Sequence, residues 1–113
     1  NPPSLGVFKN MSDDLFLSFL IGFIDGDGSI YKSKKRGRSM IITSHKNWNP
    51  ILKYWVYRLQ KIFKVKLNKK IISEYNSCIR MRWHNPFVID GLVEFIHKKN
   101  LYVCESKWNK ILT

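Results

Sequence analysis

The segment from residue 12 to residue 28 is the feature that most limits how this chain can fold. Ser12 is a suitable N-cap and acidic residues follow it in the first turn, so a helix is predicted to run from there to about Gly26. Eight of the ten residues from Leu15 to Ile24 are apolar and point in nearly every direction around the helix. A helix that is apolar all round must be buried on both sides. In a small domain its own sheet can cover one side, and the other side needs a partner.

Small residues form a stripe along this helix. Ser18, Gly22 and Gly26 follow one another at a spacing of four residues and therefore lie on one face. Small residues at this spacing let two helix backbones approach closely. Such contact would offset the cost of about 1 kcal/mol that glycine carries inside a helix relative to alanine. We expect the stripe to be a helix–helix interface, and close contact inside the same domain is the alternative.

Two aspartates, Asp25 and Asp27, lie where this helix is expected to end. Acidic residues separated by glycine can open a calcium-binding EF-hand loop. Counted from Asp25, however, the sixth residue is Ile30 instead of glycine and the twelfth is Arg36 instead of glutamate. The EF-hand reading is therefore excluded.

The rest of the chain alternates pairs of strands with helices. Alternating residues predict strands at 29–34 and 39–44, and a second pair at 65–71 and 78–83. Asn-Pro pairs at 49–50 and 85–86 indicate helix starts, and a last helix is expected from Glu105. The predicted order is α-β-β-α-β-β-α-α. It describes one α+β domain, residues 12–113, preceded by an extended N-terminal arm, residues 1–11.

Charge indicates the class of partner. Twenty Lys and Arg residues against eight Asp and Glu residues give a net charge of +12, which favours a polyphosphate partner such as DNA or RNA. Cys78 and Cys104 stand far apart with no second cysteine nearby, so we expect no zinc site and a reducing, intracellular compartment. The apolar stretch Leu15–Ile24 is too short to cross a bilayer, which takes about 20 residues, so no membrane partner is expected.

The stretch Leu20–Gly28 reads Leu-Ile-Gly-Phe-Ile-Asp-Gly-Asp-Gly and is followed by Ser29-Ile30. It resembles the motif of the LAGLIDADG homing endonucleases, and the resemblance in pattern extends from Ser12 to the end of the chain. It implies an αββαββα fold in which the motif helices of two copies, in a dimer or a fused pseudo-dimer, meet side by side. It also implies an antiparallel sheet that lies in the major groove of double-stranded DNA.

The same resemblance implies the catalytic residues. By motif position, Asp27 is the acid that binds the metal beside the scissile phosphate, Gly26 offers a backbone carbonyl to the metal, and Asp25 is structural. The implied ion is Mg²⁺, with Mn²⁺ or Ca²⁺ able to substitute. Magnesium stabilises the charge that builds up during phosphodiester hydrolysis and helps to generate hydroxide, and it needs few protein ligands because it keeps several waters.

This chain departs from the family pattern at two places. The family often has a glutamine near the end of the second strand, where Ser44 or His45 stands here. It also often has a lysine after the third helix, and Cys104 aligns there. Lys98, Lys99 and Lys107 are near that place in the sequence. Lys99 and Lys107 are kept as the candidate catalytic lysines.

Alternation assigns an apolar face and a basic, polar face to the predicted sheet. No acidic residue occupies an outward position, so we expect this face to contact DNA. Arginine and asparagine can read guanine and adenine in the major groove, whereas lysine more often contacts phosphate. The predicted DNA-binding residues are Tyr31, Ser33, Lys35, Arg38, Ser39, Ile41, Thr43, Lys66, Asn68, Lys70, Cys78, Arg80 and Arg82.

These features together favour a homing endonuclease subunit that cuts both strands of DNA at a long target site. An intron RNA-binding maturase and a non-catalytic DNA-binding protein of the same fold are the alternatives. One motif in 113 residues favours a homodimer, while a piece of a two-motif protein remains open. The high content of Lys, Ile and Asn is typical of an AT-rich genome, such as a mitochondrial one.

Overall fold

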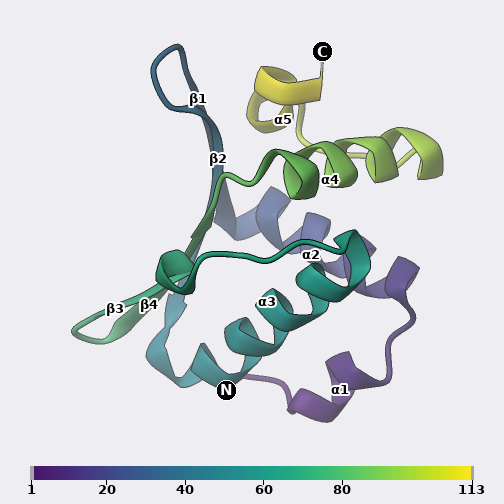
Figure 1. The fold of residues 1–113 in the computed structure, drawn as a ribbon. Coiled ribbons are helices and arrows are strands. Elements are labelled where there is room, and N and C mark those ends of the chain that lie inside the picture. Colours follow the sequence, from purple (N-terminus) through teal and green to yellow (C-terminus); the bar gives the residue numbers. More distant parts are fainter. Residues whose placement is uncertain (1, 113) are drawn as a thin grey trace.

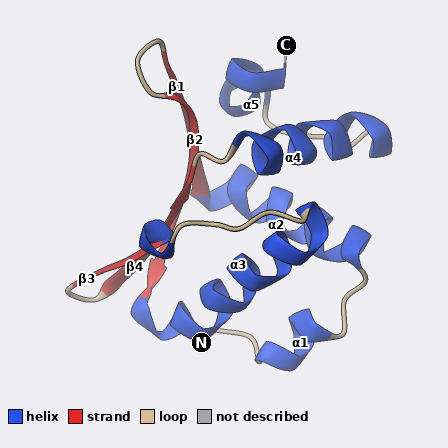
Figure 2. Cartoon of the chain, in the orientation of Figure 1, coloured by secondary structure: helices blue, strands red, loops and turns tan. Residues whose placement is uncertain are grey.

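The computed structural model describes residues 2–112 and contains a four-stranded antiparallel sheet with helices α2–α5 on one side (Figure 1 and Figure 2). The strand order is β1-β2-β4-β3. Apart from the short helix α1, the order of helices and strands is the predicted one, and the α+β fold class is confirmed. The elements are α1 (Leu5–Lys9), α2 (Asp13–Asp27), β1 (Gly28–Ser33), β2 (Gly37–His45), η1 (Lys46–Trp48), α3 (Asn49–Phe63), η2 (Lys69–Ile71), β3 (Ile72–Tyr75), β4 (Cys78–Trp83), α4 (Pro86–Lys99) and α5 (Glu105–Leu112).

Helix α2 begins where the sequence predicts and ends one residue beyond the expected Gly26. The Ser12 hydroxyl accepts a hydrogen bond from the Leu15 N–H at 3.2 Å, which satisfies one of the free N–H groups at the helix start. At the other end, a Cβ on Gly28 would lie 2.8 Å from the Ile24 Cα. The missing side chain at Gly28 therefore allows β1 to start directly after the last turn of α2.

The apolar face of the sheet meets the helices. Ile30 lies opposite Met40, and Ile42 lies opposite Met81, so alternate residues of neighbouring strands share one face. These side chains are at most 3% exposed and form the centre of the core. The predicted alternation in β1, β2 and β4 is confirmed at Ile30, Met40, Ile42, Ile79, Met81 and Trp83.

The third strand lies later in the chain than predicted. The strand expected at residues 65–71 is wrong: residues 65–68 are a loop and residues 69–71 form the 3-10 turn η2. The Gln60 side-chain oxygen accepts a hydrogen bond from the Leu67 N–H at 2.8 Å, and Asn68 Oδ1 accepts one from the Lys70 N–H at 2.9 Å. These side-chain bonds replace a sheet ladder, and the apolar alternation gives no sign of them.

The N-terminal residues are not an extended arm, so that prediction is wrong. Phe8 on α1 is fully buried, and its ring centroid lies 5.1 Å from that of Phe19 and 5.5 Å from that of Trp55. The Arg58 guanidinium donates hydrogen bonds to the backbone carbonyls of Phe8 at 3.1 Å and Met11 at 2.7 Å. Aromatic burial and these bonds hold α1 against α2 and α3. The domain boundary between residues 11 and 12 stays a prediction.

The C-terminal helices cover one end of the sheet. Asn85 caps α4, and its Oδ1 accepts hydrogen bonds from the N–H groups of Phe87 at 2.9 Å and Val88 at 3.2 Å. Helix α5 lies against β1 with Trp108 and Ile111 buried. None of the helices within residues 2–112 has the length and apolar character needed to cross a membrane.

Candidate active site and nucleic-acid interface

The two aspartates of the motif have different surroundings at the end of α2. Asp25 is half-buried, and its Oδ1 accepts hydrogen bonds from the Cys104 N–H at 2.7 Å and from the Trp108 indole N–H at 3.0 Å. Asp27 is exposed, and its carboxylate has no hydrogen bond or ion pair to any of residues 2–112. Asp25 therefore ties α5 to α2, and the carboxylate of Asp27 is open to a ligand.

Lys107 lies beside these aspartates. Its ammonium donates hydrogen bonds to the backbone carbonyls of Ile24 at 3.2 Å and Asp25 at 2.8 Å. The carbonyls in the last turn of a helix carry partial negative charge, which a cation complements. The structure thus brings one of the two candidate lysines to within two residues of Asp27.

Lys99, the other candidate, lies far from this end. Its Nζ is 2.8 Å from Asp14 Oδ2, in the first turn of α2. Thirteen residues separate Asp14 from Asp27, which at about 1.5 Å per residue is about 20 Å along the helix axis. The expectation that Lys99 is catalytic is therefore corrected: the turn after α4 places it at the opposite end of the helix.

Cys104 occupies the place where the family often has a lysine. Its thiol lies 3.2 Å from the Ser106 hydroxyl. The hydrogen bond with Ser106 and a second one from the Lys107 N–H lower the pKa of the Cys104 thiol below its ordinary value. The residue acts on the site through its backbone, which binds Asp25.

A divalent metal fits the end of α2 if a second chain or waters complete its shell. Among residues 2–112 no group of three or more His, Cys, Asp or Glu side chains could hold a metal ion. The exposed Asp27 carboxylate and the Gly26 carbonyl, which lies in the last turn, are hard oxygen donors of the kind that Mg²⁺ and Ca²⁺ take. Mg²⁺ keeps several waters, so two protein ligands from one chain suit it.

The small-residue stripe lies on the open side of α2. Gly22 and Gly26 are exposed, and a Cβ added to either would meet no atom within 4 Å outside the helix itself. Leu15 and Phe19, on the same side, are 55% and 36% exposed. Close contact of the stripe inside this chain, the alternative reading, is therefore wrong. Helix α2 therefore leaves an apolar side exposed within the described part of the chain.

The outer face of the sheet carries most of the predicted DNA-binding side chains. In the observed register Tyr31 lies opposite Ser39, Ile41 opposite Arg82, and Thr43 opposite Arg80. Ser39 is only 7% exposed although it faces outward. The Arg80 guanidinium lies over the Tyr75 ring, 5.1 Å from its centroid. Eight of the predicted residues share this outer face, namely Tyr31, Ser33, Ser39, Ile41, Thr43, Cys78, Arg80 and Arg82.

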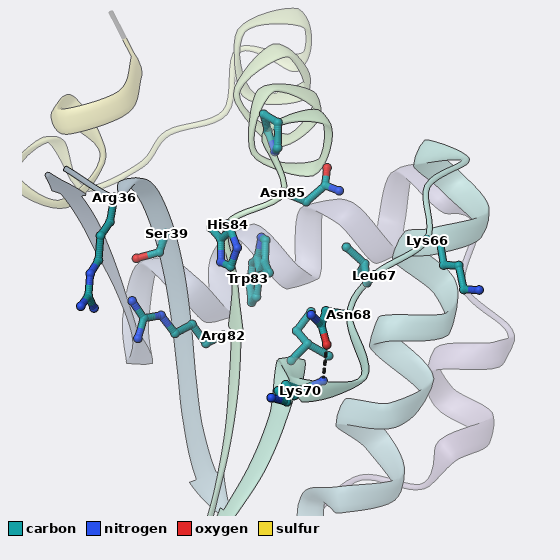
Figure 3. A pocket seen from close by; sticks show the side chains of 12 residues that line it. Arg36, Ser39, Lys66, Leu67, Asn68, Lys70, Arg82, Trp83, His84 and Asn85 are labelled. Carbon is teal, nitrogen blue, oxygen red and sulfur yellow. Dashed lines mark hydrogen bonds between the residues drawn. The ribbon is translucent and has the colours of Figure 1, made fainter. Parts of the chain in front are cut away.

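Five predicted DNA-binding residues lie elsewhere. Arg38 is on the inner side, where its guanidinium is 2.7 Å from the Asp90 carboxylate of α4, because it shares the parity of Met40. Lys35 lies in the turn between β1 and β2. Lys66, Asn68 and Lys70 are in the loop and turn before β3, and line a cavity of about 770 Å³ together with Arg36, Ser39, Arg82 and His84 (Figure 3).

Four outer-face residues are absent from the sequence-based set: Ser29, His45, Ser73 and Tyr75. Ser73 and Tyr75 lie opposite Arg80 and Cys78 on β3, so they were missed together with the strand. Asn76 follows with a positive φ of 44° in the two-residue turn between Tyr75 and Cys78. Two-residue hairpin turns are signalled by pairs such as Asn-Gly and Asp-Gly, and Asn76-Ser77 is not such a pair, so local turn signals do not place this strand.

The outer face is cationic. Glu74, the acidic residue of β3, points to the inner face of the sheet, where its carboxylate accepts a hydrogen bond from the Asn49 side chain of α3. Asp13, Asp14 and Asp90 pair with Arg58, Lys99 and Arg38 away from this face. The exposed Asp27 is the last residue of α2, and β1 starts at the residue that follows it, so Asp27 lies at the junction of this helix with the sheet.

Homing endonucleases are among the solved structures that match this chain. I-TnaI, described as a homing endonuclease, matches with a TM-score of 0.50 at 21% identity, over 80% of this chain and 63% of its own. The homing endonuclease I-CvuI, in complex with its target in the presence of calcium, matches with a TM-score of 0.43 at 16% identity over 74% of this chain and 55% of its own. A Lys-to-Ala mutant of I-SmaMI matches with a TM-score of 0.46 at 19% identity over 81% and 31%.

The fold implied by the motif is thereby confirmed, on the match to I-TnaI. No family model matches the sequence and no curated protein matches it. This chain corresponds to less than two thirds of the length of I-TnaI.

Proposed function

We propose that this chain, which has the fold of a homing endonuclease, is one catalytic half of a metal-dependent, site-specific double-strand DNA endonuclease. The observation that carries the proposal is the exposed carboxylate of Asp27. It has no partner within residues 2–112, and it lies at the junction of α2 with β1, the first strand of the sheet. A carboxylate kept free beside a surface suited to DNA is what hydrolysis of a phosphodiester through a metal requires.

The proposed partner is a second domain of the same fold. Leu15 and Phe19 together with Gly22 give α2 an exposed apolar side on which another motif helix can lie closely. A second copy of this chain is the simplest such partner. Two copies bring two Asp27 carboxylates together, one for each DNA strand.

Asp27 and the Gly26 carbonyl are the proposed metal ligands from this chain. Bound Mg²⁺ would stabilise the negative charge that develops on the phosphate and would lower the pKa of a bound water. Mn²⁺ or Ca²⁺ would fit the same oxygen donors. Lys107 neutralises the carbonyls of the preceding turn and holds a positive charge next to the site.

The outer face of the sheet is the proposed base-reading surface. Arg82 lies opposite Ile41 in the central strands, and Arg80 lies opposite Thr43. Arginine forms two hydrogen bonds to guanine in the major groove, and apolar or methyl-bearing side chains contact the thymine methyl group. The mixture of arginine, threonine and isoleucine along β2 and β4 suits direct readout of bases.

The experiment that tests the proposal is cleavage selection from a randomised DNA library with Mg²⁺, followed by assays on the selected target. Asp27→Asn keeps the shape of the side chain but weakens metal binding, so cutting is expected to fall by at least about a hundredfold, or about 2.7 kcal/mol, with DNA affinity retained. Lys61→Ala, on the exposed face of α3, is the control and leaves cutting unchanged.

The outcomes separate the proposal from the two alternatives. Binding to intron RNA with no cleavage of any DNA in the library would indicate a maturase. Sequence-specific DNA binding that neither wild type nor Asp27→Asn converts into cutting would indicate a non-catalytic binding protein. Cutting that survives Asp27→Asn would remove this residue from the active site.

A further inference from the structure

A cavity of about 770 Å³ opens at one flank of the sheet (Figure 3). Strand β3 pairs with β4 only as far as Met81, so the next residues of β4 have no strand partner on that side. The loop before β3 borders the space instead. Figure 3 shows Arg36, Ser39 and Arg82 on one side and Leu67, Asn68 and Lys70 on the other, with Trp83 between them and Lys66 at the outer end of the loop.

The cavity collects positive charge that no acidic residue offsets. Arg36, Lys66, Lys70 and Arg82 are all exposed, and within the described part of the chain none of them is paired with a carboxylate. No aspartate or glutamate is among the residues that line the cavity. Like charges gathered around one hollow repel one another, so an anion bound between the walls is stabilised by both.

We propose that this cavity holds the phosphodiester backbone of duplex DNA beside the base-reading face, an inference that rests on the proposed function. Arg82 and Ser39 belong both to the outer face and to the cavity wall, so the two surfaces are continuous. Four strands about 4.8 Å apart span about 14 Å, which is close to the width of about 12 Å of the major groove. A sheet that fills the groove meets the sugar-phosphate backbone at its flank, where the cavity lies.

Side chains, not the helix start, make this site. The first free N–H groups of α4, those of Phe87 and Val88, already donate to the Asn85 side chain. The two lysines and the arginines therefore supply the attraction. Lysine contacts phosphate as a point charge and carries no sequence information, so the cavity adds affinity that does not depend on sequence, and base choice stays with the outer face.

The separation of phosphate contacts in the cavity from base contacts on the outer face predicts how salt affects DNA binding. Each phosphate contact contributes about 0.9 to the magnitude of the slope of log affinity against log salt concentration on duplex DNA. Lys66 and Lys70 are the best residues to remove, because both are exposed and lie outside the strands. The double variant Lys66→Ala with Lys70→Ala is expected to lower the slope magnitude by about two.

The test measures fluorescence anisotropy of a labelled duplex of arbitrary sequence over a range of salt concentrations. The matched control is Lys61→Ala with Lys98→Ala, which removes the same charge from exposed positions outside the cavity. The control is expected to keep the wild-type slope. An equal fall in both variants would overturn the site and leave only a general effect of net charge. Circular dichroism checks that both variants fold.

Failure of the site and failure of the proposed function give different results. A wild type that cuts its selected target, with a double variant of unchanged slope, overturns the cavity and leaves the endonuclease intact. If the salt slope depends on Lys66 and Lys70 but the protein cuts no DNA, the phosphate-binding cavity is supported and the proposed endonuclease activity is overturned. An RNA hairpin is titrated in parallel, and a slope that changes on the hairpin alone would overturn the assignment to duplex DNA.

Discussion

Asp25 and Asp27 stand one glycine apart and have opposite roles because of what surrounds them. The carboxylate of Asp25 accepts two hydrogen bonds from the C-terminal segment, one of them from the fully buried Trp108. The carboxylate of Asp27 faces outward with no partner in residues 2–112. The hydrogen bonds of Asp25 thus hold α5 against the last turn of α2, and this turn also carries the exposed Asp27.

Removing the carboxylate of Asp25 is expected to lower stability. Asp25→Ala leaves the indole N–H of Trp108 and the N–H of Cys104 without an acceptor, and an unsatisfied buried donor costs about 1–3 kcal/mol. We expect the free energy of unfolding, measured by urea denaturation, to fall by about 2 kcal/mol. Asp25→Asn keeps one acceptor oxygen and should lose less. Equal losses in the two variants, or no loss in Asp25→Ala, would contradict the role of these bonds.

At the scale of elements, the sequence predicted most of the fold from local signals. The caps at Ser12 and Asn85 and the alternation around Met40 and Met81 appear in the structure as predicted, because each depends on neighbouring residues. The position of β3 was not predictable in this way. It depends on Gln60 of α3, which binds the loop through Leu67, and this contact joins residues seven apart across a helix end.

The candidate site likewise contains residues that local sequence signals could predict and residues that they could not. The motif itself indicated Asp27, and the structure leaves that side chain open. Whether Lys99, Lys107 and Arg38 lie near the site depends on the helix end or strand face to which the fold brings each residue. Lys99 is drawn to Asp14 and Arg38 to Asp90 by ion pairs between distant segments, and spacing along the chain cannot reveal such pairs.

Substitutions on the open side of α2 are expected to raise the stability of the isolated subunit and to weaken the association of two subunits. Gly22→Ala adds a Cβ that meets nothing within 4 Å in this chain, so the isolated subunit should gain up to about 1 kcal/mol from helix propensity. Association of two subunits should weaken at the same time, and Gly22→Leu should weaken it further. Urea unfolding at low concentration and sedimentation at high concentration measure the two effects. Glu94→Ala on α4 is the control for association, and unaltered association of Gly22→Leu would exclude this face as the interface.

The contact between α3 and α4 leaves no room at Gly91. A Cβ at this position would overlap the Phe63 ring, so Gly91→Ala is expected to destabilise the domain by about 1–3 kcal/mol through overpacking. The double variant Phe63→Leu with Gly91→Ala should recover part of the loss, because the smaller side chain makes space. Thermal unfolding of both variants and of Phe63→Leu alone checks this. A double variant less stable than either single one would show that the two residues do not share one space.

At the scale of the whole molecule, the proposed pairing of two domains would make this chain one half of a symmetric arrangement. The chain has an open apolar helix face, an exposed Asp27 at the end of that helix and a cationic sheet face, and a two-fold axis beside α2 would double all three. Two sheets would then extend along the DNA on either side of a centre that contains both aspartates. In this proposed arrangement each subunit would bind its half of the target and would supply one metal-binding carboxylate.

A mixed dimer tests this arrangement directly. Wild-type and Asp27→Asn chains with different affinity tags are co-expressed, and the dimer that carries both tags is isolated. Because each chain supplies one Asp27, this dimer is expected to cut one strand, so a supercoiled plasmid that contains the selected target becomes nicked circles. The doubly tagged wild-type dimer should give linear plasmid, and the doubly tagged Asp27→Asn dimer should leave the plasmid intact. Linear plasmid from the mixed dimer at the wild-type rate would contradict the assignment of one Asp27 to each strand.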